Sequence, residues 1–135
     1  MTQTTERQEN LLSLFIDAAI EVHRELGPGY DEAIYENALA VEMELRKIPF
    51  ERQKVVEVFY KGVRVGEGRI DLFLGDEVVV ELKAVEELNQ KHMAQVISYL
   101  KATRKPLGLL VNFHEFLLKK GLKRILWTFP CVFAS

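Results

Sequence analysis

Two carboxylates and one lysine stand where the sequence otherwise predicts buried strands. Asp71 lies in one apolar run, and Glu81 and Lys83 interrupt the next one. An unpaired charge inside a sheet costs several kcal/mol, so these side chains need a compensating partner. Two carboxylates offer the hard oxygen ligands that Mg²⁺ and Mn²⁺ prefer, and the backbone carbonyl of Leu82 can add a third. We therefore predict a divalent-metal site that includes these residues.

The turn between the two runs decides whether the carboxylates meet. If residues 75–77 form a three-residue loop, Leu74 pairs with Val78 and Asp71 falls opposite Glu81. A two-residue loop would place the carboxylates on opposite faces, so the chemistry favours the longer loop. Alternation then predicts a polar face with Asp71, Glu81 and Lys83 and an apolar face with Ile70, Leu72, Leu74, Val78, Val80, Leu82 and Ala84.

Lys83 shares the face of the two carboxylates and can act on a water at the metal. Its ammonium group would lower the pKa of that water or stabilise the charge that develops on an attacked phosphate. The alternative is a salt-bridge cluster of Asp71, Glu81 and Lys83 with a structural role alone.

Polar residues on two predicted helices can join the same site. Apolar periodicity predicts helices over 31–47 and 88–103, and each carries polar side chains beside its buried stripe. Taken singly, a tyrosine at such a position usually packs in the core and a polar side chain usually faces solvent. A shared site is therefore predicted only because these residues occur together. They are Glu32 and Tyr35 on the first helix and His92, Gln95 and Tyr99 on the second.

The other elements follow from periodicity and from Gly and Pro breaks. We predict a helix over 11–26, strands over 55–60, from 63 through the hairpin to 85, and over 107–113, a short basic helix or turn over 115–123, and an apolar edge strand or dimer contact over 125–129. In the 31–47 helix, the expected buried stripe is Ile34, Ala38, Val41 and Leu45.

The order of these elements predicts the fold class. A helix between two sheet strands implies a crossover, and therefore a parallel pairing at that point. The fold class is α/β (α+β), with a mixed sheet made of a three-strand antiparallel meander and one crossover strand, flanked by helices.

Length and composition predict one domain with one core. The chain has 135 residues, of which 48% are hydrophobic, and we expect residues 1–10 to be a polar, loosely ordered N-terminus. That segment lacks the basic and apolar regions of a signal peptide, and no apolar run approaches the ~20 residues of a membrane span. We expect a cytoplasmic protein with no membrane contact. The single Cys131 is expected to be a small apolar filler.

Net charge argues against a dedicated DNA-binding protein. At −2, the chain has no global positive field to attract nucleic acid. Basic clusters of this kind are usually solvated faces, and they would serve as phosphate contacts only beside the acidic site. They are Arg46, Lys47, Arg52 and Lys54; Lys101, Arg104 and Lys105; and Lys119, Lys120, Lys123 and Arg124.

A short motif resembles a known family. Residues 29–35 match the Gly-x-x-Glu-x-x-Tyr signature of the GxxExxY proteins, a branch of the PD-(D/E)xK nuclease superfamily. Further blocks resemble that family in order, at 69–72, 80–85, 92–95 with Tyr99 and Leu100, 109–113 and 123–125, so the resemblance covers about 11–125. The Asp, Glu-x-Lys and Gln-x-x-x-Tyr elements are also similar to RecB-like nucleases. Ile70 stands where the superfamily's name has proline.

The resemblance implies a restriction-endonuclease-like core and a role for each site residue. Asp71 and Glu81 would bind Mg²⁺ or Mn²⁺, Lys83 would assist the water, and Glu32 would bind the metal directly or through water. Gln95 and Tyr99 would orient the lysine, the water or the phosphate backbone. We also expect Tyr35, His92 and Tyr99 to contact nucleic acid.

We therefore predict a metal-dependent nuclease that hydrolyses phosphodiester bonds in DNA. One alternative is a catalytically inactive module of the same fold that binds nucleic acid or protein. Another is a structural oligomer subunit, because the apolar segment 125–133, with Trp127, Phe129 and Phe133, could bury itself on a second copy of the chain.

Overall fold

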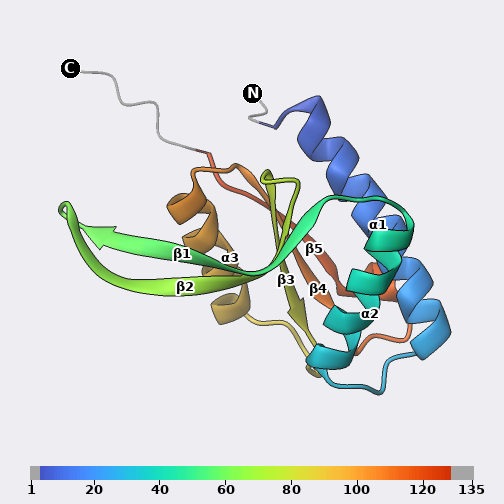
Figure 1. The fold of residues 1–135 in the computed structure, drawn as a ribbon. Coiled ribbons are helices and arrows are strands. Elements are labelled where there is room, and N and C mark those ends of the chain that lie inside the picture. Colours follow the sequence, from blue (N-terminus) through green and yellow to red (C-terminus); the bar gives the residue numbers. More distant parts are fainter. Residues whose placement is uncertain (1–3, 129–135) are drawn as a thin grey trace.

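A computed structural model describes residues 4–128 as a five-stranded sheet between helices (Figure 1). The elements are α1 (Glu6–Leu26), α2 (Glu32–Leu45), β1 (Phe50–Tyr60), β2 (Val63–Leu74), β3 (Val78–Lys83), α3 (Gln90–Thr103), β4 (Leu107–Asn112), the 3₁₀ helix η1 (Leu118–Gly121) and β5 (Leu122–Leu126). The strand order is β1-β2-β3-β4-β5, and only the β3–β4 pair within these residues is parallel. The predicted α/β (α+β) class, with its meander and crossover strand, is confirmed.

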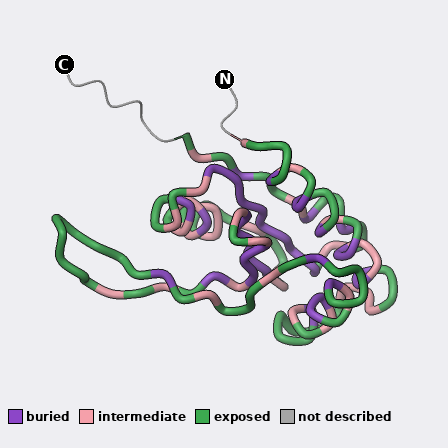
Figure 2. Tube along the Cα trace, turned by 45° about the horizontal axis from the view of Figure 1, so that its top comes forward, coloured by how far each residue is buried: buried purple, intermediate pink, exposed green. Residues whose placement is uncertain are grey.

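The sheet is buried on both faces. Helices α1 and α2 cover one face and α3 covers the other (Figure 1). All six residues of β4 and the first five of β3 are buried, as expected for strands with both faces covered. The tube in Figure 2 shows the buried segments in the middle of the molecule and the exposed ones on the outer helix faces and the β1–β2 hairpin.

Helix α1 begins five residues before the predicted position. Thr5 caps it, because its hydroxyl accepts the Gln8 backbone N–H at 3.1 Å and the Gln8 side chain accepts the Thr5 N–H at 2.9 Å. This reciprocal pair is a capping box, which stabilises a helix start by satisfying two backbone donors. The expectation of a loosely ordered segment is therefore corrected for residues 6–10, which are helical.

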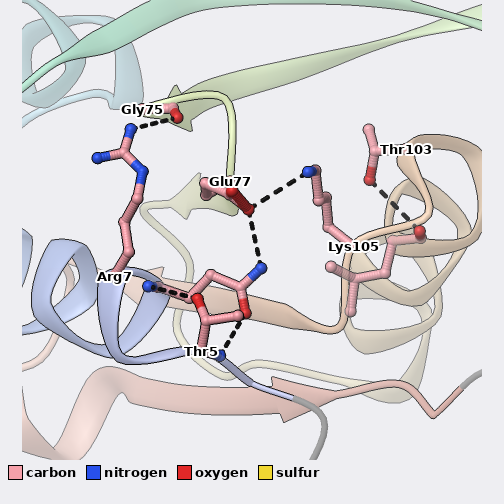
Figure 3. Close-up of polar contacts among 8 residues, drawn as sticks. Thr5, Arg7, Gly75, Glu77, Thr103 and Lys105 are labelled. Atoms are coloured by element: carbon pink, nitrogen blue, oxygen red, sulfur yellow. Dashed lines mark hydrogen bonds and ion pairs between the residues drawn. The ribbon is translucent and has the colours of Figure 1, made fainter.

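The start of α1 also holds the turn between β2 and β3. Arg7 Nη2 donates to the Gly75 carbonyl at 2.9 Å, and Gln8 Nε2 donates to Glu77 Oε1 at 2.9 Å. Lys105 Nζ reaches the same Glu77 oxygen from the connection between α3 and β4 at 3.3 Å (Figure 3). These two contacts lower the pKa of the Glu77 carboxyl, with Gln8 the larger cause. The turn is thus held by α1 and by the connection after α3.

The hairpin register agrees with the prediction. Leu74 pairs with Val78, and the ladder continues to Leu72 and Val80, so residues 75–77 form the turn. The predicted apolar face packs against α1 and α2, apart from one residue. Ile70 packs under α3 instead, because β2 leaves the backbone ladder of β3 after Leu72 and twists into the β1–β2 hairpin.

Helix α2 buries a different face from the predicted one. Ile34, Val41 and Leu45 are 42%, 60% and 73% exposed. Apolar residues occur on more than one side of this helix, so its periodicity does not select the buried side; contacts with α1 and the sheet do. The buried residues are Tyr35, Leu39, Ala40 and Met43.

The β1–β2 hairpin is longer than predicted and extends beyond the body of the protein (Figure 1). β1 begins at Phe50 instead of Val55, and the turn at Lys61 and Gly62 agrees with the prediction. The segment past the last β2–β3 pair exposes several large apolar side chains: Val55, Val58, Phe59, Tyr60, Val63 and Val65.

The last described elements are short. The basic segment 115–123 contains the 3₁₀ helix η1, and β5 is an edge strand antiparallel to β4. β5 ends at Leu126, and the Phe129 and Phe133 proposed for a dimer contact lie outside the described residues. Among residues 4–128, we find no helix with the length and apolar character that a membrane span requires.

Candidate active site

Asp71 and Glu81 meet where β2 and β3 separate. The Asp71 backbone N–H donates to Glu81 Oε2 at 2.7 Å, and the Leu82 N–H donates to Asp71 Oδ2 at 2.8 Å. Each carboxylate therefore takes a backbone N–H of the opposite strand, just past the last regular backbone pair of the hairpin. Glu81 is 2% exposed and Asp71 is half-buried. The two carboxylates are rigidly held, side by side, at the edge of the core.

The positive charge and hydrogen bonds at the site do not fully compensate its negative charge. Burial raises the pKa of the Glu81 carboxyl to about 8, and the neighbouring Asp71 charge adds to the effect. Burial also raises the pKa of Asp71, although its hydrogen bonds with Leu82 and Gln53 oppose the shift. Both carboxyls therefore resist ionising together. A divalent cation would favour the doubly ionised form, so the donor chemistry of this pair fits such an ion.

The donor set includes backbone as well as side chains. Within residues 4–128, no three His, Cys, Asp or Glu side chains are gathered into a ready metal-binding group. The N–H and C=O of one strand residue point to the same edge. Because the Leu82 N–H faces Asp71 and the Lys83 carbonyl accepts from Phe113 on the β4 side, the Leu82 carbonyl faces the Asp71 side. This carbonyl can complement the two carboxylates.

Lys83 is tied to helix α3. Its Nζ donates to Gln95 Oε1 at 3.2 Å, and Gln95 Nε2 donates to the Tyr99 hydroxyl at 3.4 Å. The Tyr99 ring lies against β2 at Gly68, where an added Cβ would come within 2.6 Å of Tyr99 Cε1. The structure thus joins Lys83, Gln95 and Tyr99 in one chain of contacts that begins beside Glu81.

Glu32 approaches from the first turn of α2. Its carboxyl is exposed, yet its pKa is raised, first by partial burial and then by the charges of Asp71 and Glu36. The Lys83 charge opposes this shift. Glu32 therefore lies within electrostatic range of both Asp71 and Lys83, with α2 on one side of the site and α3 on the other.

Tyr35 is a core residue, so the prediction that it contacts nucleic acid is corrected. It is 0% exposed, and its ring stacks on Phe113 with centroids 4.4 Å apart. Its hydroxyl donates to the Gly27 carbonyl and accepts the Tyr30 N–H at 3.2 Å. Tyr35 instead fixes the loop from Gly27 to Tyr30 that leads into Glu32.

His92 caps helix α3. Its Nδ1 accepts the Asn89 N–H at 3.1 Å, and Asn89 Oδ1 accepts the His92 N–H at 3.1 Å. The pKa of His92 is lowered by burial and by the charge of Lys83. The side chain thus stands near the lysine and starts the helix that carries Gln95, a structural role that the sequence pattern did not indicate.

Two residues at the site were missed by the sequence analysis. Gln53 Nε2 donates to Glu36 Oε1 at 2.7 Å and to Asp71 Oδ1 at 3.3 Å. Arg52 Nε holds the other Glu36 oxygen at 3.0 Å. Gln53 lies outside the predicted strands and Glu36 reads as a surface residue of α2, so no sequence signal connected either one to Asp71.

Most of the basic clusters are engaged elsewhere. Only Arg52, through Glu36, connects to the acidic site among the basic contacts within the described residues. Five further cluster residues contact an acid or a ring: Arg46 with Glu42, Lys54 with Glu51, Lys105 with Glu77, Arg124 with Glu9, and Lys101 with the Trp127 ring.

Comparison with known proteins agrees with this geometry. The model of the PD-(D/E)XK nuclease superfamily matches residues 9–125, which is nearly the whole chain and contains every site residue described above. A search of curated proteins returned no match to the sequence. The chain therefore belongs to the PD-(D/E)XK nuclease superfamily.

Proposed function

We propose that this protein is a metal-dependent nuclease that hydrolyses phosphodiester bonds in DNA. The observation that carries the proposal is the Asp71–Glu81 pair, one half-buried and one buried carboxylate held by backbone N–H groups beside a lysine that Gln95 contacts. Within the superfamily, the motif at residues 29–35 and the Gln-x-x-x-Tyr element of α3 support a place in the GxxExxY and RecB-like branches.

Asp71, Glu81 and the Leu82 carbonyl would hold a Mg²⁺ or Mn²⁺ ion, with Glu32 as a further ligand, directly or through water. When bound, such an ion neutralises phosphate charge and makes a water more acidic. The pKa shifts of the two carboxyls support this assignment, because both arise from burial of negative charge that a cation would relieve.

Lys83 would supply hydrogen-bond donors and positive charge at the reacting phosphate. An ammonium group has three N–H donors, and the Gln95 carbonyl occupies one of them. The others are available to orient a water or to stabilise the charge that develops on a phosphate oxygen. Gln95 in turn is held by Tyr99, so the ammonium position depends on the α3 face.

Nucleic acid would approach over the surface between α2 and α3. Tyr99 and His92 line the α3 side near Lys83 and remain the proposed nucleic-acid contacts, whereas Tyr35 is buried. Of the basic clusters, Arg52 is the residue that the contacts connect to the acidic site, and Glu36 already holds it, so the clusters offer few phosphate contacts here. We therefore expect weak binding that depends on the metal more than on a basic surface.

The test is a cleavage assay on single-stranded DNA, duplex DNA, structured DNA and RNA. Mg²⁺, Mn²⁺ and EDTA are compared for the wild-type protein, for Asp71→Ala and for Glu44→Gln, a control at an exposed α2 residue. We expect cleavage of DNA with Mg²⁺ or Mn²⁺ that EDTA and Asp71→Ala abolish and Glu44→Gln preserves. Cleavage that persists in EDTA, or no cleavage of any substrate, contradicts the proposal. Metal-independent binding of DNA without cleavage would instead favour the inactive module.

A further inference from the structure

Gln53 adopts an unusual backbone conformation in the middle of the β1–β2 ladder. Its φ is +51°, in the left-handed region that disfavours residues with a side chain. Regular pairs flank it on both sides, Arg52 with Leu72 and Lys54 with Ile70. The residue between those two partners on β2 is Asp71. The strained position therefore lies directly across from a candidate metal ligand.

The side-chain amide nitrogen of Gln53 donates hydrogen bonds to two carboxylates. Its Nε2 lies 3.3 Å from Asp71 Oδ1 and 2.7 Å from Glu36 Oε1. Since the Leu82 N–H already holds Asp71 Oδ2 at 2.8 Å, both oxygens of the Asp71 carboxylate have a hydrogen-bond donor. The carboxylate plane is thus fixed from β1 and from β3.

Glu36 links the same contact to helix α2. Its second oxygen accepts from Arg52 Nε at 3.0 Å, so two successive residues of β1 donate hydrogen bonds to one carboxylate of the helix. Glu32 lies one turn earlier on α2. The Gln53 amide therefore connects the strand that carries Asp71 to the helix that carries Glu32.

We propose that Gln53 is a positioning residue for the metal site, retained in a strained conformation because its amide orients Asp71. This inference rests on the proposed function. Strained backbone is often stored at functional sites, and partners of metal ligands commonly tune affinity. Glycine would fit this φ better but has no amide, so stability and metal binding should respond to substitution in opposite directions.

The test compares Gln53→Gly with Gln53→Asn. Glycine relieves the strain, and asparagine tolerates the left-handed region but is one methylene shorter, so neither can bridge Asp71 and Glu36. We expect both variants to unfold at the wild-type temperature or higher and to bind Mn²⁺ about 10–100-fold more weakly in calorimetric titrations. The matched control is Lys47→Gly, which relieves a similar φ of +59° at an exposed position after α2. It should not change Mn²⁺ affinity.

The outcomes separate this inference from the proposed function. If the wild-type protein binds Mn²⁺ and Gln53→Gly binds it with the same affinity, the positioning role of Gln53 is overturned and the proposed function stands. A lower melting temperature together with unchanged Mn²⁺ affinity assigns Gln53 to the structure and also overturns it. Absence of Mn²⁺ binding in the wild-type protein overturns the proposed function and this inference together.

Discussion

The Glu81 carboxylate accepts the backbone N–H of Asp71 at 2.7 Å, so the residue that bears one carboxylate also holds the other. This contact stands in place of the next backbone pair of the hairpin, and it keeps the two acidic groups adjacent without a cation. Burial first, and then the neighbouring Asp71 charge, raise the pKa of Glu81 to about 8, so ionising both carboxyls together is costly.

The first prediction concerns metal binding. Asp71→Ala with Glu81→Ala should abolish Mn²⁺ binding in calorimetric titration, because it removes both carboxylates of the donor set. The control is Glu57→Ala with Glu67→Ala, which removes a second directly opposed pair that is exposed and bridged by Arg64. That control should bind Mn²⁺ as the wild type does. Equal binding by the two double variants would contradict the assignment of the site.

The second prediction concerns pH. The pKa of Glu81 is raised from 4.5 to about 8, so the folded protein holds this proton more tightly than the unfolded chain does. The stability from Glu81 is therefore fully present below about pH 4.5 and is lost as the pH rises through about 8. In urea unfolding without metal, the free energy of unfolding should fall between pH 5 and 9, by on the order of a few kcal/mol.

Glu81→Gln isolates this effect. Glutamine keeps an oxygen for the Asp71 N–H but cannot ionise, so the variant should be more stable than the wild type at about pH 9, by about 1–4 kcal/mol, and nearly equal at about pH 5. The same dependence on pH in both proteins would show that other groups cause the decline. Added Mn²⁺ should raise the free energy of unfolding of the wild type and leave that of Glu81→Gln unchanged.

The third prediction concerns Lys83. Lys83→Ala should lower the cleavage rate roughly 10²–10³-fold, because it removes a charge proposed to act on the reacting phosphate. Mn²⁺ affinity and the melting temperature should change little. The structural alternative predicts the reverse, a clear loss of stability with no cleavage by either protein. Gln95→Ala should produce a smaller rate loss, since it only orients the lysine.

The fourth prediction concerns the contact between the hairpin and α3. Gly68→Ala would place a Cβ within 2.6 Å of Tyr99 Cε1, so the ring must move and its hydrogen bond with Gln95 should weaken. We expect a stability loss of about 1–3 kcal/mol and slower cleavage. Gly66→Ala is the matched control, because a Cβ there meets nothing within 4 Å. An equal effect of both variants on cleavage would show that Tyr99 does not support the site.

Local patterns were sufficient for much of the fold. Alternation left two loop lengths open, and the need for Asp71 and Glu81 to share a face selected the three-residue turn and the pairing of Leu74 with Val78, which the structure has. The helix α3 followed from apolar spacing over residues 88–103, and the crossover to β4 followed from chain order. The centre of the candidate site could therefore be predicted from residue chemistry, and the register followed from it.

The sequence by itself determined which side chains could share a strand face or a helix turn, since those relationships depend on fixed backbone periods. It could not determine which side of α2 is buried, because its apolar residues permit more than one face. Tyr35 lies in the core, where its ring stacks on Phe113, far along the chain. Likewise, Gln53 meets Asp71 only because the pairing of β1 with β2 places the two residues opposite one another. Contacts between distant segments decided these features, since packing and pairing energies that favour one arrangement exist only once the whole fold has formed.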